Sequence, residues 1–164
     1  MILMNAILVA TDFGETSDAA LVYGRNLART FGARLHVVHV AEDVRATAGQ
    51  ELYAGDLHEL QAEVVETATT RLRSSLTADD LTVLGATPAV RVSSNPANAI
   101  IEYAKEVHVD IIIVGTHGRG PISHLLMGSV AEHVVRHAPC PVLVVRPNEH
   151  EFVVPDPVGA YTRI

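Results

Sequence analysis

The chain has 164 residues, of which 48% are hydrophobic and only 4% aromatic, so we expect one domain with an aliphatic core. Its formal charge of −7 argues against broad electrostatic binding to nucleic acid or to an anionic membrane surface. The single cysteine, Cys140, excludes an intramolecular disulfide framework, and no apolar run approaches the ~20 residues of a membrane span. The first ten residues lack the basic region of a secretory signal, so we expect a cytoplasmic protein.

Five apolar stretches rich in β-branched residues predict strands. They are residues 6–10, 35–40, a stretch within 81–93 with 89–92 preferred, 110–114 and 141–145. Between them, apolar residues at helical spacing predict four helices. These helices are expected to begin near residues 16, 57, 96 and 129 and to end near residues 31, 76, 107 and 137.

Local capping residues define some of these helix ends. Thr16 or Ser17 can cap the first helix, and Gly32 can end it because glycine tolerates positive φ. Asn95 followed by Pro96 provides a capping side chain and a proline at the first position of the third helix. These signals place both helices independently of their apolar spacing.

Strands alternating with helices describe an α/β protein with an open, doubly wound parallel sheet of five strands and four helices. Ligands bind such sheets beyond the carboxyl ends of the strands, where the strand order reverses. We assign residues 1–146 to this domain and expect residues 147–164, which contain three prolines, to form an extended tail. Residues 41–56 have no strong period and two glycines, so we expect a mobile excursion that could act as a lid.

The strand at 110–114 runs directly into a glycine-rich stretch. The stretch is Gly115-Thr116-His117-Gly118-Arg119-Gly120, and Gly128-Ser129-Val130 then begins a helix. A sharp turn, close backbone approach and a helix N-terminus together are typical of a phosphate-binding loop, although glycines here could also serve only as turn residues. No lysine follows the glycines as in a Walker A loop, and the turn after the first strand lacks the dinucleotide fingerprint.

The spacing Gly115-x-x-Gly118, nine residues, Gly128-Ser129 resembles the nucleotide signature of the universal stress protein family. Residues 138–145 are similar to the closing strand of that family, and the resemblance covers about residues 2–146. It implies a strand order of 3-2-1-4-5 and ATP as the cofactor, with Mg or Mn bound only through the nucleotide.

The resemblance also implies the positions that contact the nucleotide. It places the adenine at the backbone of Val40, the ribose near Ala10, Thr11 and Gly115, and the phosphates near the glycine motif. The phosphate-side residues are Thr116, His117, Gly118, Arg119, Gly128, Ser129 and Val130. Asp12 could cap the first helix, but the resemblance favours contact with the base or with a divalent cation that bridges the phosphates. Arg119 could pair with phosphate oxygens or be a solvated loop residue.

Other reactive side chains have weaker arguments. His117 has a suitable pKa for acid–base chemistry, but no carboxylate beside it in sequence orients it. His133 and His137 share a helix face without the glutamate of the zinc-protease pattern. Cys140, between two prolines, is interpreted as a packing residue. We see no set of nucleophile, base and orienting group, so we assign no catalytic residue and expect at most slow ATP hydrolysis.

The resulting hypothesis is an ATP-binding universal stress protein that acts as a nucleotide-dependent switch or partner in a stress response. The resemblance implies a homodimer that pairs through the fifth strand. One alternative is a small nucleotide-hydrolysing enzyme, which would need steady turnover that is lost with His117 or Asp12. The other is a protein-interaction module with a structural glycine loop, which predicts dimerisation without nucleotide binding.

Overall fold

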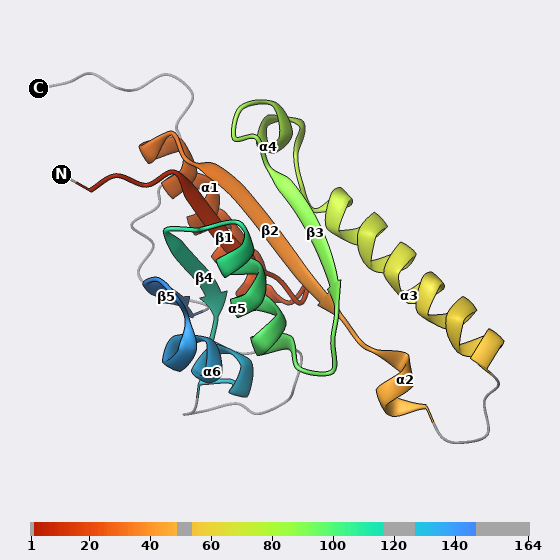
Figure 1. The fold of residues 1–164 in the computed structure, drawn as a ribbon. Coiled ribbons are helices and arrows are strands. Elements are labelled where there is room, and N and C mark those ends of the chain that lie inside the picture. The colour runs from red at the N-terminus through yellow and green to blue at the C-terminus, as the bar shows by residue number, and fades with distance from the viewer. Residues whose placement is uncertain (1, 49–53, 117–126, 147–164) are drawn as a thin grey trace, which may run out of the picture.

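The computed structural model describes residues 2–48, 54–116 and 127–146, which form a parallel five-stranded sheet of order β3-β2-β1-β4-β5 (Figure 1). The strands are β1 (Ala6–Ala10), β2 (Arg34–Ala41), β3 (Thr87–Val92), β4 (Ile111–Gly115) and β5 (Val142–Val145). The helices in the described ranges are α1 (Glu15–Phe31), α2 (Val44–Thr47), α3 (Ala54–Ser74), α4 (Ala78–Thr82), α5 (Pro96–Glu106) and α6 (Ser129–His137). The sequence-derived fold class and strand order are confirmed.

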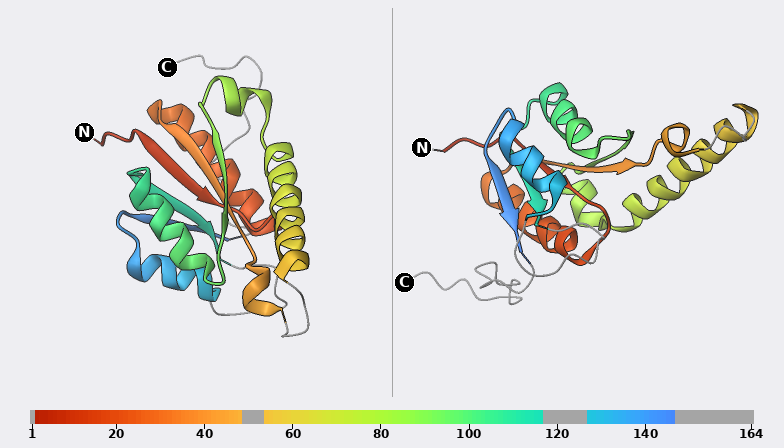
Figure 2. Two further views of the ribbon diagram at one scale, coloured as in Figure 1. Left: turned by 45° about the vertical axis from the view of Figure 1, so that its right-hand side comes forward. Right: turned by 90° about the horizontal axis from the view of Figure 1, so that it is seen from below.

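Two hydrophobic layers hold the helices against the sheet, one on each face (Figure 2). Strand residues alternate between faces, so Val37 of β2 packs with α1 and α3 while Val38 packs with α5 and α6. Central strands β1 and β4 are buried on both faces, which explains why their sequences are continuous apolar runs. Because the strands are all parallel, the loops at their carboxyl ends share one edge of the sheet.

Several sequence-derived boundaries are confirmed. Gly32 ends α1 with φ of 65°. The Asn95 side chain caps α5 by accepting from the Asn98 amide, and Pro96 is the first residue of that helix. Helix α6 spans the predicted residues 129–137. These features depend on a few neighbouring residues, which is why the sequence alone predicts them.

The expected cap of α1 is wrong. Gly14 is the N-cap, and Ser17 is the third residue of the helix rather than its cap. The Ser17 hydroxyl accepts from the Gly14 amide at 3.1 Å and donates to the Gly14 carbonyl at 2.9 Å. Thr16 lies within the helix, so the first turn forms earlier than the side-chain preferences suggested.

The predicted helix count is too low, because α2 and α4 are each a single short turn without a repeated apolar stripe. Helix α4 is capped by Thr77, and its last two residues fall within the stretch 81–93 in which the third strand was expected. Strand β3 begins at Thr87, two residues before the preferred stretch. Within the expected excursion 41–56, Ala41 ends β2, and α2 and the start of α3 are ordered helices.

Two expectations fall outside the described residues. The remainder of the excursion, residues 49–53, and the expected tail, residues 147–164, are not among the described ranges. In those ranges, none of the helices combines the length and the apolar character needed to cross a bilayer.

Candidate functional site

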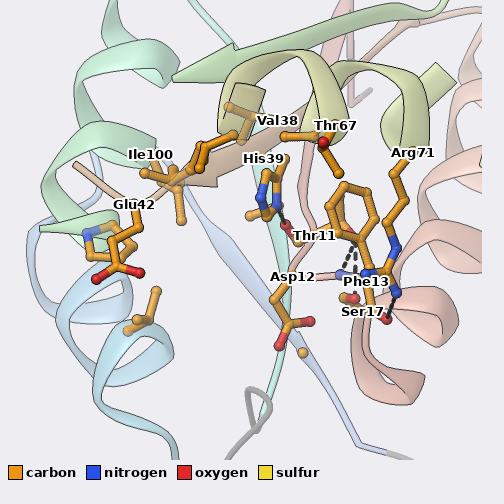
Figure 3. Close-up of a pocket in the computed structure, with 18 of the residues that line it drawn as sticks. Thr11, Asp12, Phe13, Ser17, Val38, His39, Glu42, Thr67, Arg71 and Ile100 are labelled. Atoms are coloured by element: carbon orange, nitrogen blue, oxygen red, sulfur yellow. Dashed lines mark hydrogen bonds between the residues drawn. The ribbon is translucent and has the colours of Figure 1, made fainter. Parts of the chain in front are cut away.

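A cavity of about 720 Å³ opens at the carboxyl ends of β1, β2 and β4 (Figure 3). Its walls come from both faces of the sheet. Ile100 of α5 and Val130 of α6 lie on one side, and Arg71 of α3 and Phe13 lie on the other. The strand ends form its floor, with Ala10, Thr11, Val38, His39, Val40, Ala41, Val114 and Gly115 among the lining residues. This is the edge at which the sequence placed a ligand.

The cavity exists because β1 stops before its two neighbours. Ala10, its last residue, lies beside Val38, yet β2 continues to Ala41. On the other side Val9 pairs with Ile113, and β4 continues to Gly115. Neighbouring parallel strands are about 4.8 Å apart, so the ends of β2 and β4 flank a gap roughly 10 Å wide.

Backbone polar groups of both flanking strands point into this gap. The Thr11 amide donates to the Val38 carbonyl, so even-numbered residues of β2 direct their N–H and C=O groups toward β1. Val40 therefore faces the gap. The Thr116 amide donates to Val145 of β5, so Gly115, one residue earlier, faces the gap from the opposite side. A flat polar ligand would meet hydrogen-bonding groups on two sides.

The turn after β1 is held by its own side chains. Thr11 Oγ1 accepts from the Phe13 amide at 3.0 Å, and Asp12 Oδ1 accepts from the Gly14 amide at 3.0 Å. Between these bonds Phe13 has φ of 63°, the left-handed conformation that costs a non-glycine residue about 1–2 kcal/mol. Such strain often accompanies a functional constraint. Phe13 and Asp12 leave the turn in different directions, as Figure 3 shows.

The Phe13 ring contacts two side chains from other elements. His39 of β2 lies with its ring centroid 4.3 Å away, and the Arg71 guanidinium lies 4.5 Å from the Phe13 centroid. Arg71 Nη2 also donates to the Phe13 carbonyl at 3.4 Å. His39 Nδ1 lies 2.8 Å from the Thr11 carbonyl, and because a carbonyl only accepts, Nδ1 carries the proton. The turn is thereby attached to both β2 and α3.

Two of the motif glycines have roles within the protein. A Cβ on Gly115 would lie 2.8 Å from Thr16 Cβ and 2.9 Å from the Thr16 carbonyl carbon, so this position must be glycine for α1 to pack. The Gly128 amide donates to the Thr116 carbonyl at 2.6 Å, which joins the start of α6 to the end of β4. Close packing thus accounts for glycine at 115 without reference to any ligand.

Helix α6 begins beside the cavity, and Val130 contributes to the wall. The first amides of a helix have no acceptor within it, and they form the positive end of its dipole. Because the Gly128 amide is already bonded, the amides that follow it in the first turn, beginning with Ser129 and Val130, could receive an anion here.

The structure brings together most of the predicted residues that it describes. The residues that line the cavity are Ala10, Thr11, Asp12, Val40, Gly115 and Val130. Thr116, Gly128 and Ser129 are not among the lining residues and lie at the end of β4 and the start of α6. The remaining predicted residues, His117, Gly118 and Arg119, lie outside the described ranges. Six of the predicted positions therefore line one cavity, and the part of a nucleotide that each would contact stays a prediction.

Sequence reasoning missed the α3 side of the cavity. The lining residues from α3 are Leu60, Glu63, Val64, Thr67, Ala68 and Arg71, and Phe13, Ser17, His39 and Glu42 were also not predicted. The helical spacing of residues 60, 64 and 68 was visible, but it indicates only a buried face and not what that face covers. His39 could have been noticed as the neighbour of Val40.

The charges of the described lining are mainly negative. Asp12, Glu42 and Glu63 contribute carboxylates, and Arg71 contributes a guanidinium. No group of three or more His, Cys, Asp or Glu residues in the described ranges could hold a metal ion.

The remaining candidate side chains lie away from the cavity. His133 and His137 stack with ring centroids 4.2 Å apart, and His133 Nε2 lies 2.9 Å from Asn98 Oδ1, which links α6 to α5. Cys140 packs against the core layer of α5 and α6. Burial, followed by the nearby Asp110 carboxylate, raises the pKa of the Cys140 thiol and favours its unreactive protonated form.

The reversal of strand order between β1 and β4, with a cavity at that point, places the chain among the doubly wound α/β proteins that bind ligands at the switch point. The sequence model of the universal stress protein family matches residues 4–146. The chain belongs to the universal stress protein family.

Individual relatives agree with this assignment. A universal stress protein of Thermus aquaticus is 33% identical over 144 residues, which is 88% of this chain and 100% of the relative. The solved structure of universal stress protein UspA from Lactobacillus plantarum is 27% identical with a TM-score of 0.75, and it covers 89% of this chain and 100% of its own.

Two further solved structures share the fold and contain nucleotides. One is a universal stress protein in complex with cAMP, which is 22% identical with a TM-score of 0.56. The matched region spans 88% of this chain and 98% of that protein's chain. The other is the Archaeoglobus fulgidus universal stress protein in complex with dAMP, 23% identical with a TM-score of 0.52, covering 88% and 99%.

Proposed function

We propose that this protein is an ATP-binding universal stress protein that acts in the cytoplasm as a nucleotide-dependent switch or partner in a stress response. The observation that carries the proposal is the pair of backbone segments, Val40 and Gly115, that face each other across the gap beyond β1. Adenine presents donors and acceptors along its edges, so a base lying in the gap can bond to strand backbone. The adenine nucleotides in the two complexes of the same fold support this choice of base.

The chain's own residues suggest how such a ligand would be held. The base would lie at the Val40 backbone, and the ribose near Thr11, Asp12 and Gly115. The phosphates would extend toward the Ser129 and Val130 amides, where the start of α6 favours negative charge. A bound Mg or Mn ion would neutralise phosphate charge beside the Asp12 carboxylate.

We propose that hydrolysis of the bound ATP is slow or absent. The histidine in the described lining, His39, directs its Nδ1 proton to the Thr11 carbonyl, so this ring nitrogen holds the turn and is not available to take a proton from a reacting water. Binding without efficient turnover suits a switch, because the bound state persists long enough to be recognised by a partner.

A second candidate function is a protein-interaction module in which the glycines are only structural. The close approach of Gly115 to Thr16 and the hydrogen bond from Gly128 to Thr116 favour it, because both explain the motif without a nucleotide. This candidate predicts no nucleotide binding and an intact dimer.

The deciding experiment combines extraction with a binding measurement. Denatured protein is analysed for released nucleotide by chromatography and mass spectrometry, and thermal unfolding is followed with ATP and magnesium. A ligand that binds only the native state adds about 2.7 kcal/mol of stability at a hundredfold excess over its dissociation constant. We expect this stabilisation in the wild type and in Gly55→Ala, a substitution on the exposed start of α3, and its loss in Gly118→Val.

A folded wild-type protein that yields no nucleotide and gains no stability from ATP would refute the proposal and leave the interaction module. Adding GTP under the same conditions tests the base, because adenine and guanine present different donors and acceptors to the Val40 backbone. We expect GTP to stabilise the protein less than ATP does.

A further inference from the structure

Arg71 contacts Phe13, which is adjacent in sequence to Asp12. We propose that Arg71 is a positioning residue of the nucleotide site: it holds Phe13 against His39 and so keeps the turn after β1 in the conformation that presents the Asp12 carboxylate to the ligand. This inference rests on the proposed nucleotide-binding function. Arg71 belongs to α3, and no residue of the glycine motif lies in that helix.

Phe13 contacts Arg71 and His39 through its ring. The Arg71 guanidinium lies 4.5 Å from the Phe13 centroid, and the His39 centroid lies 4.3 Å from it. A guanidinium over an aromatic face is attractive because the ring face is electronegative. Arg71 adds a hydrogen bond to the Phe13 carbonyl, so it contacts both the ring and the backbone of the same residue (Figure 3).

These contacts support an uncommon backbone conformation at Phe13. Phe13 has φ of 63°, which an L-residue with a large side chain adopts only when surrounding contacts enforce it. Without Arg71, fewer contacts oppose rotation of Phe13 back to negative φ. The hydrogen bonds of Thr11 and Asp12 to the amides of Phe13 and Gly14 depend on the same backbone geometry.

The turn carries Asp12, which lines the cavity. Asp12 Oδ1 accepts from the Gly14 amide, so the orientation of the carboxylate follows the turn. His39, the residue before Val40 in β2, joins the turn to that strand because its Nδ1 bonds to the Thr11 carbonyl. Arg71 supports this arrangement from the α3 side, and rotation of Phe13 would move the carboxylate away from its present direction.

Arg71 could instead contact the ligand directly, since it also lines the cavity. The two roles differ in their dependence on Phe13. A positioning role needs the ring, so Arg71→Gln and Phe13→Leu should weaken binding to a similar degree and should not add in the double variant. A direct role of Arg71 predicts that the losses of binding free energy in the two single variants add in the double variant.

The experiment measures the ATP dissociation constant by calorimetry in the presence of magnesium. It compares the wild type with Arg71→Gln, Arg71→Lys, Phe13→Leu and the Arg71→Gln/Phe13→Leu double variant. Arg73→Gln is the matched control because Arg73 is exposed on the same helix. We expect Arg71→Gln to raise the ATP dissociation constant about fivefold. The dissociation constant of Arg71→Lys should lie between those of the wild type and Arg71→Gln, and that of Arg73→Gln should equal the wild-type value.

Hydrogen exchange of the Gly14 amide in the absence of nucleotide provides a second reading. Its bonds to Asp12 and Ser17 should protect it in the wild type, and Arg71→Gln should speed its exchange while Arg73→Gln should not. Wild-type ATP affinity and unchanged Gly14 exchange in Arg71→Gln would overturn the inference. If the wild type itself binds no nucleotide, the proposed function fails, and the Gly14 exchange alone decides whether Arg71 positions the turn.

Discussion

Gly24 shows how closely α1 packs on the sheet. A Cβ at this position would lie 2.3 Å from Val9 Cγ2, a separation that real atoms do not adopt. Gly24 is buried, and its neighbour Val9 is fully buried, so neither can move into solvent. Gly24→Ala should therefore lower the free energy of unfolding by about 1–3 kcal/mol, measured by urea denaturation, despite the better helix propensity of alanine.

Gly55→Ala is the control for this substitution. Gly55 is also in a helix, α3, and an added Cβ would have nothing within 4 Å. Alanine there should leave the protein unchanged or more stable by up to about 1 kcal/mol. Equal effects of the two substitutions would show that α1 can shift to accept a methyl group.

His36 predicts a pH dependence of stability. Its Nδ1 lies 3.0 Å from the Tyr103 hydroxyl, and its Nε2 is buried with no hydrogen-bond partner among the described residues. Burial, and then the nearby positive charge of Arg34, lower the pKa of His36 from its ordinary 6.5. As the pH falls below about 6.5 the unfolded chain binds the proton more readily, so the free energy of unfolding should decrease.

One such group changes the free energy of unfolding by at most about 1.4 kcal/mol per pH unit. Urea titrations between about pH 7 and pH 5 should therefore give a smaller decrease for His36→Gln than for the wild type. The control His58→Gln, at an exposed position of α3, should keep the wild-type slope. A His36→Gln slope equal to that of the wild type would mean that His36 is not a source of the pH dependence.

Single residues differ in how far the sequence alone predicts them. The roles of Gly32 and Asn95 depend on their immediate neighbours, and both are confirmed. The close contact of Gly24 with Val9 and the positive φ of Phe13 depend on residues that are distant in sequence or in other elements. Such constraints arise only when the helices and strands pack together, so local patterns carry no signal for them.

At the scale of elements, α4 is held to α1 by a buried ion pair. Arg25 Nε lies 2.9 Å from both carboxylate oxygens of Asp80, which is fully buried, and Arg25 also donates to the Ser75 carbonyl. Burial alone would raise the pKa of Asp80, but the hydrogen bonds from Arg25 and Thr77 outweigh it and lower the pKa below 3.8. The pair thus orients a helix of only five residues.

Removing this carboxylate should be costly. Asp80→Asn leaves Arg25 largely buried without its charge partner, and we expect a loss of about 3 kcal/mol in chemical denaturation. The exposed neighbour in the same helix gives the control, and Asp79→Asn should change stability by less than about 1 kcal/mol.

The stability that Asp80 contributes is complete above its unfolded-state pKa and is lost as the pH falls through its lower folded-state pKa. The difference between wild type and Asp80→Asn should therefore narrow from about pH 5 to about pH 3. A difference that does not change over this range would mean that the charge of Asp80 is not what holds α4.

Elements were predictable where they carry an apolar pattern, a continuous run in a strand or a repeated stripe in a helix. The strands of the sheet and the helices α1, α3, α5 and α6 have either continuous apolar runs or repeated stripes, and each was predicted within a few residues. Helices α2 and α4 have four and five residues, too few for a period to be detected. What stabilises α4 is Arg25, which lies 55 residues away from Asp80 in the chain.

At the scale of the whole molecule, β5 is the edge strand beside β4, and we propose that it pairs with a second copy of the chain. The Pro141 carbonyl accepts from the Ile112 amide of β4, and the Val145 carbonyl accepts from the Thr116 amide. Odd-numbered residues of β5 therefore direct their backbone N–H and C=O groups toward β4. The Val144 N–H consequently points out of the sheet, where a partner strand could accept it. Val144→Pro removes that donor without removing a bond to β4 and should shift the protein to monomer in light scattering.

The opposite edge of the sheet provides the matched control. The Ser93 amide donates to Ala41 of β2, so the Val92 N–H points out of the sheet at β3. Val92→Pro should leave the oligomeric state of the wild type unchanged. A folded Val144→Pro protein that remains dimeric would place the interface elsewhere.

The general location of the site was predictable because parallel strands bring all their following loops to one edge. Asp12, Val40 and Gly115 were expected there and line one cavity. The contribution of α3 was not predictable, since the sequence does not show across which strand end a helix passes. Arg71, 58 residues from Phe13, is the clearest example.

The early end of β1 gives the cavity an unusual character. A ligand in the gap would occupy the place of a further stretch of peptide, with Val40 on one side and Gly115 on the other. The protein would then recognise its ligand as a sheet recognises a strand, through main-chain groups that substitutions other than to proline leave in place. Selectivity at such a place would tolerate extensive sequence divergence, provided that the lengths of the three strands are preserved.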